Sequence, residues 1–151
     1  MSRRAANSVP NWELPIEEPI MITGQINGRY EAVIPIHLQR VGGTVHSVEA
    51  ILDTGFNGTL TLPTDLIATL KLPWRTRGSA ILADGREEMF DIYAATVIWD
   101  GRSRRILVEA VESLPLVGMR LLADYDVRLR VQPGGMVHIA AVPEAEVSRM
   151  S

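Results

Sequence analysis

The stretch Ala50-Ile51-Leu52-Asp53-Thr54-Gly55 decides how the rest of this sequence is interpreted. Three apolar residues lead directly into a carboxylate, a hydroxyl and a glycine. The tripeptide Asp-Thr-Gly by itself is ordinary turn chemistry. A turn aspartate usually follows polar residues, however, whereas this one ends an apolar segment and is followed by Phe56, Leu60 and Leu62. The context therefore indicates a functional carboxylate at the end of a buried strand.

Each residue of the tripeptide suits one kind of chemistry. An aspartate buried beside a second carboxylate cannot ionise independently, because two like charges a few ångströms apart repel each other. Such a pair shares one proton, so one member can take a proton from water while the other donates to a carbonyl oxygen. Gly55 allows close approach of the backbone, and the Thr54 hydroxyl can satisfy buried backbone groups. We therefore treat Asp53, Thr54 and Gly55 as the candidate catalytic residues.

The surrounding sequence has the two-residue period of β-strands. Apolar and polar residues alternate over 30–39 and 44–52, and this pattern, rich in β-branched residues, predicts strands. Further strands are expected at 21–23, 59–62, 79–83, 88–98, 105–111, 127–131 and 136–141. Turn signals separate these runs at Asn27-Gly28, Gly42-Gly43, Asp84-Gly85, Asp100-Gly101 and Pro133-Gly134-Gly135.

Two short helices interrupt the expected strands. Pro63 suits the first turn of a helix that places Leu66, Ile67 and Leu70 on one face. Residues 120–125 are expected to form one or two further helical turns. The sequence thus predicts an all-β protein, mainly β with two short helices.

The chain has 151 residues, which fits one domain. Residues 1–19 are rich in Pro, Glu, Asn and Arg, and we expect them to form a flexible N-terminal arm. The domain is expected to span 20–142, followed by a C-terminal tail over 143–151.

Composition excludes several classes of function. The net charge of −3 argues against nucleic acid or an anionic membrane as partner, and Arg102, Arg104 and Arg105 indicate a solvated edge. The absence of cysteine excludes a thiol nucleophile, disulfides and thiolate metal sites. No apolar run suggests a signal peptide or a membrane span, so a cytoplasmic location is expected.

Other kinds of site fit the sequence less well. His37, His46 and His138 are isolated on expected strands without metal-ligand spacing, so no metal and no cofactor is expected. Residues 52–59 superficially match a phosphatase loop, but that chemistry needs a second aspartate where Gly55 stands.

Three segments occur in an order typical of one protein family. The first is the strand and loop of residues 50–55. The second is Ile81-Leu82-Ala83-Asp84-Gly85, and the third is Leu116-Val117-Gly118 followed by Leu121-Leu122. Over residues 30–139 the chain resembles the retropepsin-like (clan AA) aspartic proteases, particularly their small prokaryotic members.

The resemblance implies a closed β-barrel acid-protease fold with one lobe per chain, and hydrolysis of polypeptides by an activated water. It implies that Ala83, Asp84 and Gly85 lie at the tip of a flap that binds substrate. Because Asp-Thr-Gly occurs once, it also implies a homodimer in which each copy supplies one Asp53.

Three features differ from the family pattern. Phe56 stands where many relatives have Ala, Ser or Thr, and Met119 stands where an arginine is usual, with Arg120 next. The expected flap tip has one glycine, Gly85, rather than several. The alternative function is a non-catalytic dimeric module of the same fold that binds extended peptides by strand addition.

Overall fold

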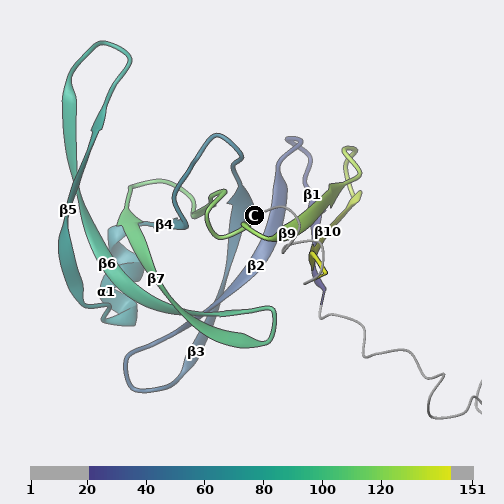
Figure 1. Cartoon of the computed structure of the whole chain (residues 1–151), viewed down its shortest axis with the longest axis horizontal. Helices are drawn as coiled ribbons and strands as arrows, with labels where there is room; N and C mark the ends of the chain where they lie inside the picture. The colour runs from purple at the N-terminus through teal and green to yellow at the C-terminus, as the bar shows by residue number, and fades with distance from the viewer. Residues whose placement is uncertain (1–20, 144–151) are drawn as a thin grey trace, which may run out of the picture.

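The computed structural model describes residues 21–143, which form ten strands and one short helix (Figure 1). The expected N-terminal arm, and the expected tail from residue 144 onward, fall outside this range. The strands are β1 (Ile22–Ile26), β2 (Ala32–Gln39), β3 (Val45–Leu52), β4 (Leu60–Leu62), β5 (Trp74–Ile81), β6 (Glu87–Trp99), β7 (Arg102–Ala110), β8 (Leu116–Val117), β9 (Tyr125–Leu129) and β10 (Met136–Ala141). The helix α1 spans Thr64–Leu70.

The strands form a ring. Hydrogen bonding follows the order β5-β6-β7-β4-β8-β3-β2-β1-β10-β9, and an additional pairing of β6 with β2 joins two distant members of this series. The pairing closes six strands into a ring, where the resemblance implied a closed barrel: β6, β7, β4, β8, β3 and β2. Strands β1, β10 and β9 extend the sheet beyond β2, and β5 extends it beyond β6. The prediction of a mainly β fold is confirmed.

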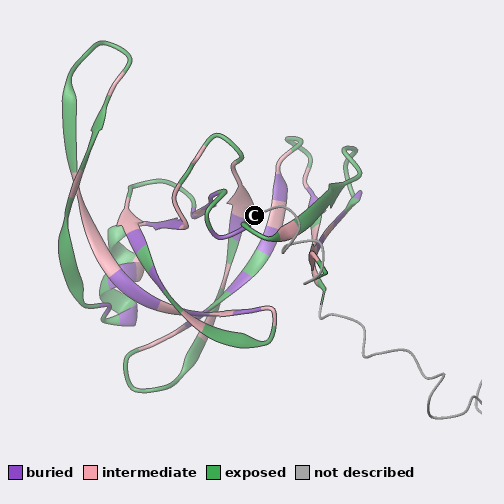
Figure 2. Cartoon of the chain, viewed as in Figure 1, coloured by how far each residue is buried: buried purple, intermediate pink, exposed green. Residues whose placement is uncertain are grey.

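The core follows from alternation along the strands. In β2 the side chains of Ile34, Ile36 and Leu38 are buried, whereas Pro35 and His37 between them are exposed. Each fully buried aliphatic side chain of this kind contributes ~1.5–3 kcal/mol to folding. Figure 2 shows buried residues along the ring strands and exposed residues over the outer half of the β5–β6 hairpin. The ring is therefore the stable scaffold, and the hairpin projects from it.

The turn signals all connect antiparallel strands, as predicted. Positive φ angles at Asp100 (55°) and Gly101 (76°) fit the tight β6–β7 turn, because mirror-image turns need two such residues. Gly85, with a φ of 89°, occupies the corresponding tight position between β5 and β6.

Only the first of the two expected helices is present among the described residues. α1 forms as predicted, with Ile67 and Leu70 buried. The prediction for residues 120–125 is wrong, because 119–124 form turns and β9 begins at Tyr125. The amides of Leu121 and Leu122 both point to the Gly118 carbonyl, at 3.2 and 3.4 Å. The segment is too short to offset the cost of starting a helix, and it reverses directly into β9.

Candidate active site

A two-residue strand positions the Asp53 loop. β8 lies between β3 and β4, pairing in parallel with Ile51 and Leu52 on one side and antiparallel with β4 on the other. Because β3 and β4 are consecutive in the chain but not adjacent in the sheet, residues 53–59 must cross the end of β8. This crossing brings Asp53 close to Gly118.

The main chain and the side chain of Asp53 are both held. Its amide donates to the Val117 carbonyl at 2.9 Å, and its Oδ1 accepts the Gly55 amide at 2.9 Å. The amide of Phe56 also returns to the Asp53 carbonyl, at 3.1 Å. A carboxylate that accepts a backbone N–H forms a charge-assisted bond, which is stronger than a neutral one. The loop therefore fixes the direction of a half-buried carboxylate.

The crossing is closed by bonds between residues some sixty positions apart. Gly118 donates to the Thr59 carbonyl at 2.9 Å, Met119 to that of Phe56 at 2.8 Å, and Arg120 to that of Gly58 at 3.1 Å. A Cβ on Gly118 would lie 2.2 Å from the Gly58 carbonyl oxygen, closer than any such contact allows. Position 118 must therefore be glycine for the two segments to pass.

Phe56 fills the space that the crossing glycines leave open. Carbons of its ring lie 2.6 Å from the positions that a Cβ would take at Gly58 and at Gly118. A carboxylate oxygen of Glu109 lies 2.8 Å from the same point at Gly58, so Glu109 borders the loop as well. Burial raises the pKa of Glu109. An apolar ring thus packs at the position directly after Asp53-Thr54-Gly55.

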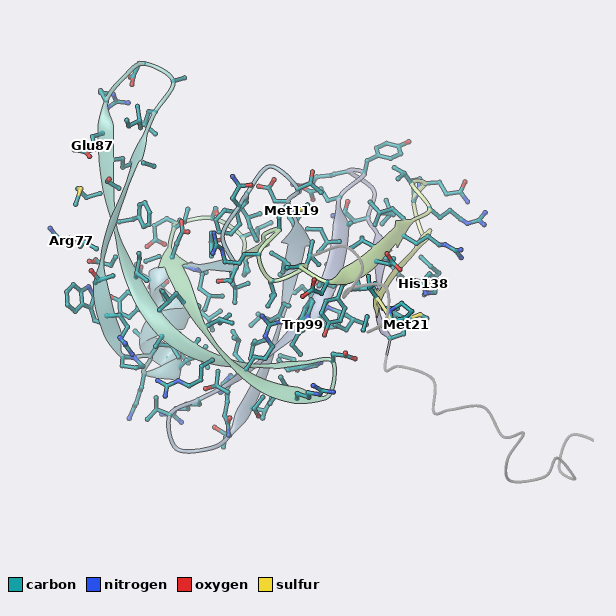
Figure 3. All side chains as sticks on the ribbon, viewed as in Figure 1. Met21, Arg77, Glu87, Trp99, Met119 and His138 are labelled. Carbon is teal, nitrogen blue, oxygen red and sulfur yellow. The ribbon has the colours of Figure 1, made fainter. Side chains whose placement is uncertain are left out.

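Asp53 and Thr54 line a cavity of about 430 Å³. The cavity lies against β9 and the β1–β2 turn, and its other lining residues are Ile26, Tyr30, Glu31, Ala32, Ile51, Leu52, Met119, Leu122, Tyr125, Val127, Leu129 and Val131. Several of the apolar ones face solvent in the single chain, with exposed fractions of 64% for Tyr30, 60% for Val131 and 46% for Met119 (labelled in Figure 3). The carboxylate is therefore set at the margin of an exposed apolar surface.

One wall of this cavity is fixed to the core through Tyr125. Its ring packs edge-on against the buried Trp99, with centroids 5.7 Å apart, and its hydroxyl donates to Asp100 Oδ2 at 3.0 Å. Burial, followed by the hydrogen bond and the charge of Asp100, raises the pKa of Tyr125. β9 is thereby held in place beside the Asp53 loop.

The expected flap tip is not brought to Asp53. Ala83, Asp84 and Gly85 lie at the free end of the β5–β6 hairpin, which projects from the ring in Figure 1, and none of them lines the Asp53 cavity. Asp84 Oδ1 accepts the Arg86 amide at 3.0 Å and its Oδ2 pairs with Arg86 Nε at 2.6 Å. These bonds, the backbone one first, lower the pKa of Asp84. Its observed role is that of a turn former.

The histidines lie on strands, as predicted. His37 Nδ1 is 2.7 Å from Ser47 Oγ, and His138 Nδ1 is 3.1 Å from the Met21 sulfur (Figure 3). Within residues 21–143 no group of three histidine or acidic side chains is arranged to hold a metal ion. The same residues contain no helix with the length and hydropathy that crossing a membrane requires.

Comparison with known proteins identifies the fold. No protein-family model and no curated protein sequence matches the chain. Among solved structures, a retropepsin-like aspartic protease from Rickettsia conorii superposes with a TM-score of 0.52 at 15% sequence identity. The match covers 81% of this chain and 91% of that one. The fold is retropepsin-like. At this identity the likeness concerns the fold alone.

Some residues around Asp53 in this retropepsin-like fold were not among the sequence-based candidates. Val127, Leu129 and Val131 share a period of two, so their common face could have been predicted, but not its proximity to Asp53. The sequence indicated only that Tyr30 lies close to the Asn27-Gly28 turn, and not that it borders Asp53. In the structure Tyr30 adopts a φ of 63°. For Glu109 the sequence showed only a polar residue near the end of an expected strand, which does not predict its place beside the Asp53 loop.

Proposed function

We propose that this chain is an aspartic endopeptidase whose catalytic dyad is formed by Asp53 and the same residue of a second copy. The observation that carries the proposal is the setting of the Asp53 carboxylate. It ends a core strand of a retropepsin-like fold, is held by Val117 and Gly55, and lines the cavity of about 430 Å³.

The second carboxylate has no source within the Asp53 cavity. Asp-Thr-Gly occurs once in the sequence, and the other acid of the cavity, Glu31, accepts the Asn27 side-chain amide at 2.8 Å. A two-fold axis beside Asp53 would bring two identical loops together. It would also cover exposed apolar side chains such as Tyr30 and Met119, and contiguous apolar surface of this kind marks interfaces. The proposed homodimer therefore provides the second carboxylate of the dyad and also buries these exposed apolar side chains.

The chemistry then follows from the shared proton. The ionised Asp53 takes a proton from a water molecule as the water attacks the peptide carbonyl, while the protonated Asp53 donates to the carbonyl oxygen. Collapse of the tetrahedral intermediate returns a proton to the departing amine. Thr54, exposed in the single chain, supports the partner loop across the axis, and Gly55 keeps the turn open. Ala83, Asp84 and Gly85 cover an extended polypeptide substrate once the hairpin bends toward the cleft.

The test replaces Asp53 with Asn. We expect wild-type dimer to cleave denatured protein at acidic to neutral pH, and Asp53→Asn to lower kcat/KM by about 10²–10⁴. Asp65→Asn, a matched change at an exposed position of α1, should leave cleavage within about twofold. Sedimentation confirms the dimer for each protein. If confirmed dimers of wild type and Asp53→Asn are equally inert at every pH, the peptidase proposal is wrong.

Phe56 favours the alternative function, a non-catalytic dimer that binds extended peptides. A phenyl ring cannot hydrogen-bond the carboxylate as a hydroxyl at this position can. Under this alternative a peptide captured by the dimer remains intact, and Asp53→Asn binds it as tightly as wild type. Mass spectrometry of the captured peptide separates the two functions.

A further inference from the structure

A second cavity lies at the opposite end of β3 from Asp53. Its volume is about 240 Å³, and its lining residues are Gln39, Arg40, Val41, Gly42, Gly43, Leu72, Pro73, Ala94, Ala95, Thr96 and Arg105. They come from the end of β2, the β2–β3 turn, the connection between α1 and β5, the middle of β6, and β7. Figure 1 shows the β2–β3 turn and the β3–β4 loop at opposite ends of the ring. This cavity is separate from the candidate active site.

The charge in this cavity is unbalanced. Its lining contains two arginines, Arg40 and Arg105, and no acidic residue. Within residues 21–143 the ion pairs are Arg77 with Asp91 and Arg86 with Asp84, so neither cavity arginine has an acidic partner there. An arginine cannot relieve this by losing its proton, because the guanidinium stays charged at any ordinary pH.

The side chain of Arg40 shows more directly that, within the part of the chain that the structure describes, a positively charged group in this cavity lacks a partner. Its Nε atom is buried and has no hydrogen-bond acceptor among the described residues. Leaving a buried charged donor unsatisfied is costly, so such groups are ordinarily paired. The backbone of Arg40 is already committed, since its amide donates to the Thr44 carbonyl at 2.6 Å and its carbonyl accepts from Gly43 at 2.8 Å. The turn thus fixes the residue, while its Nε lacks an acceptor within residues 21–143.

Neutral donors stand beside the two arginines. Gln39 pairs with Thr96 across β2 and β6, and Thr96 pairs with Arg105 across β6 and β7, so the three side chains share one face in a row. Their neighbours Leu38, Val97 and Ile106 point the other way, into the core. An amide, a hydroxyl and a guanidinium therefore line up on the same outer face.

We propose that this cavity binds an oxyanion, the carboxylate or phosphate group of a ligand. The planar guanidinium presents several N–H donors in a fork that matches the oxygens of either group. A water molecule occupies ~30 Å³ in the liquid, so the cavity has room for such a group together with hydrating waters. Arg40 supplies the buried Nε, Arg105 the second positive charge, and Thr96 and Gln39 neutral donors.

The first test is a thermal-shift and calorimetric titration of the full chain. Sodium acetate and inorganic phosphate are compared with sodium chloride at the same ionic strength and pH 7. We expect acetate, phosphate or both to raise the Tm beyond the chloride control, because a ligand that binds only the folded state stabilises it. A response to acetate alone identifies a carboxylate site, and a response to phosphate alone a phosphate site.

Variants then locate the site. Arg40→Gln and Arg105→Gln should each raise the Kd about tenfold or more, since each removes a charged donor. Arg102→Gln, on the same strand but outside the cavity, should bind as wild type does.

An NMR measurement keeps the proposal testable even if a variant fails to fold. In wild type labelled with ¹⁵N-arginine, the Nε–H resonance of Arg40 should shift as the anion is added. Absence of any shift and of any anion-specific Tm change in wild type would overturn the proposal. So would retention of full anion binding by both Arg40→Gln and Arg105→Gln.

Discussion

Two turns of this molecule have the same local chemistry and opposite surroundings. At Asp53 and at Asp84, the aspartate Oδ1 accepts the amide two residues later, at 2.9 and 3.0 Å. Asp53 ends a core strand and faces an apolar cavity without a cationic partner among the cavity's lining residues. Asp84 is exposed on a projecting hairpin and is paired with Arg86. A turn of this kind therefore only orients a carboxylate, whereas the neighbouring side chains decide whether the carboxylate is free to react.

The largest expected difference between the two turns is in activity. Asp53→Asn should lower kcat/KM by about 10²–10⁴, because it removes a proton acceptor and donor from the proposed dyad. Asp84→Asn should lower kcat/KM by less than about tenfold, since it alters only the turn at the end of the β5–β6 hairpin. Both are measured on one peptide substrate with dimer confirmed. Equal losses for the two variants would mean that Asp53 has no special role.

The second prediction concerns the support of the Asp53 loop. Gly118→Ala should lower the free energy of unfolding by about 1–3 kcal/mol, because the added methyl would overlap the Gly58 carbonyl. Gly28→Ala, where nothing lies within 4 Å of the added carbon, serves as the matched control and should change stability by less than about 0.5 kcal/mol. Urea denaturation at fixed protein concentration measures both. Equal stability of the two variants would contradict the crowded crossing.

The third prediction contrasts Glu109, beside the Asp53 loop, with exposed carboxylates. Burial raises its pKa, so its contribution to stability is complete below the unfolded-state pKa and is lost as pH rises through the folded-state pKa. Glu109→Gln should therefore gain stability relative to wild type between pH 4 and pH 7. Glu88→Gln, at an exposed position of β6, should show no such trend. A difference in Tm that is flat with pH would show that Glu109 is not desolvated.

The smallest effect is expected at Asp84 itself. Its pKa is lowered by the bonds from Arg86, so the stability that it contributes is present above its unfolded-state pKa and is lost as pH falls through the folded one. The amide of Arg86 should exchange faster with solvent as pH falls through that range, after correction for the intrinsic rate. In Asp84→Asn this additional change should disappear. Persistence of the change in the variant would assign it to another group.

Features encoded by neighbouring residues could be predicted from the sequence. The apolar strand before Asp53 and the glycine turns define most strands within a few residues, because period and turn chemistry are local. β5 is an exception, since it begins at Trp74 rather than near residue 79. Its first half is exposed and lacks the alternation that a half-buried strand shows.

Features that depend on distant partners could not be predicted. β8 has only two residues, and its position between β3 and β4 comes from pairing with segments more than fifty residues away. Residues 120–125 have the composition of a helical turn but follow the crossing into β9. Arg105 is exposed, as expected of a solvated edge, but its place beside Arg40 at a cavity depends on β2, β6 and β7 lying side by side. Each of these features depends on tertiary contacts that the local pattern does not contain.

The insertion of β8 between β3 and β4 also determines when, during folding, the Asp53 loop can reach its native conformation. Val117, Gly118 and Met119 all bond to residues 53–59, so a growing chain that ends before position 116 lacks the groups that hold the loop. Contacts this distant in sequence form late, since the intervening chain must first be closed into a loop. During synthesis Asp53 emerges from the ribosome long before its supports. A nascent chain therefore carries the carboxylate without the geometry that the proposed peptide hydrolysis would need.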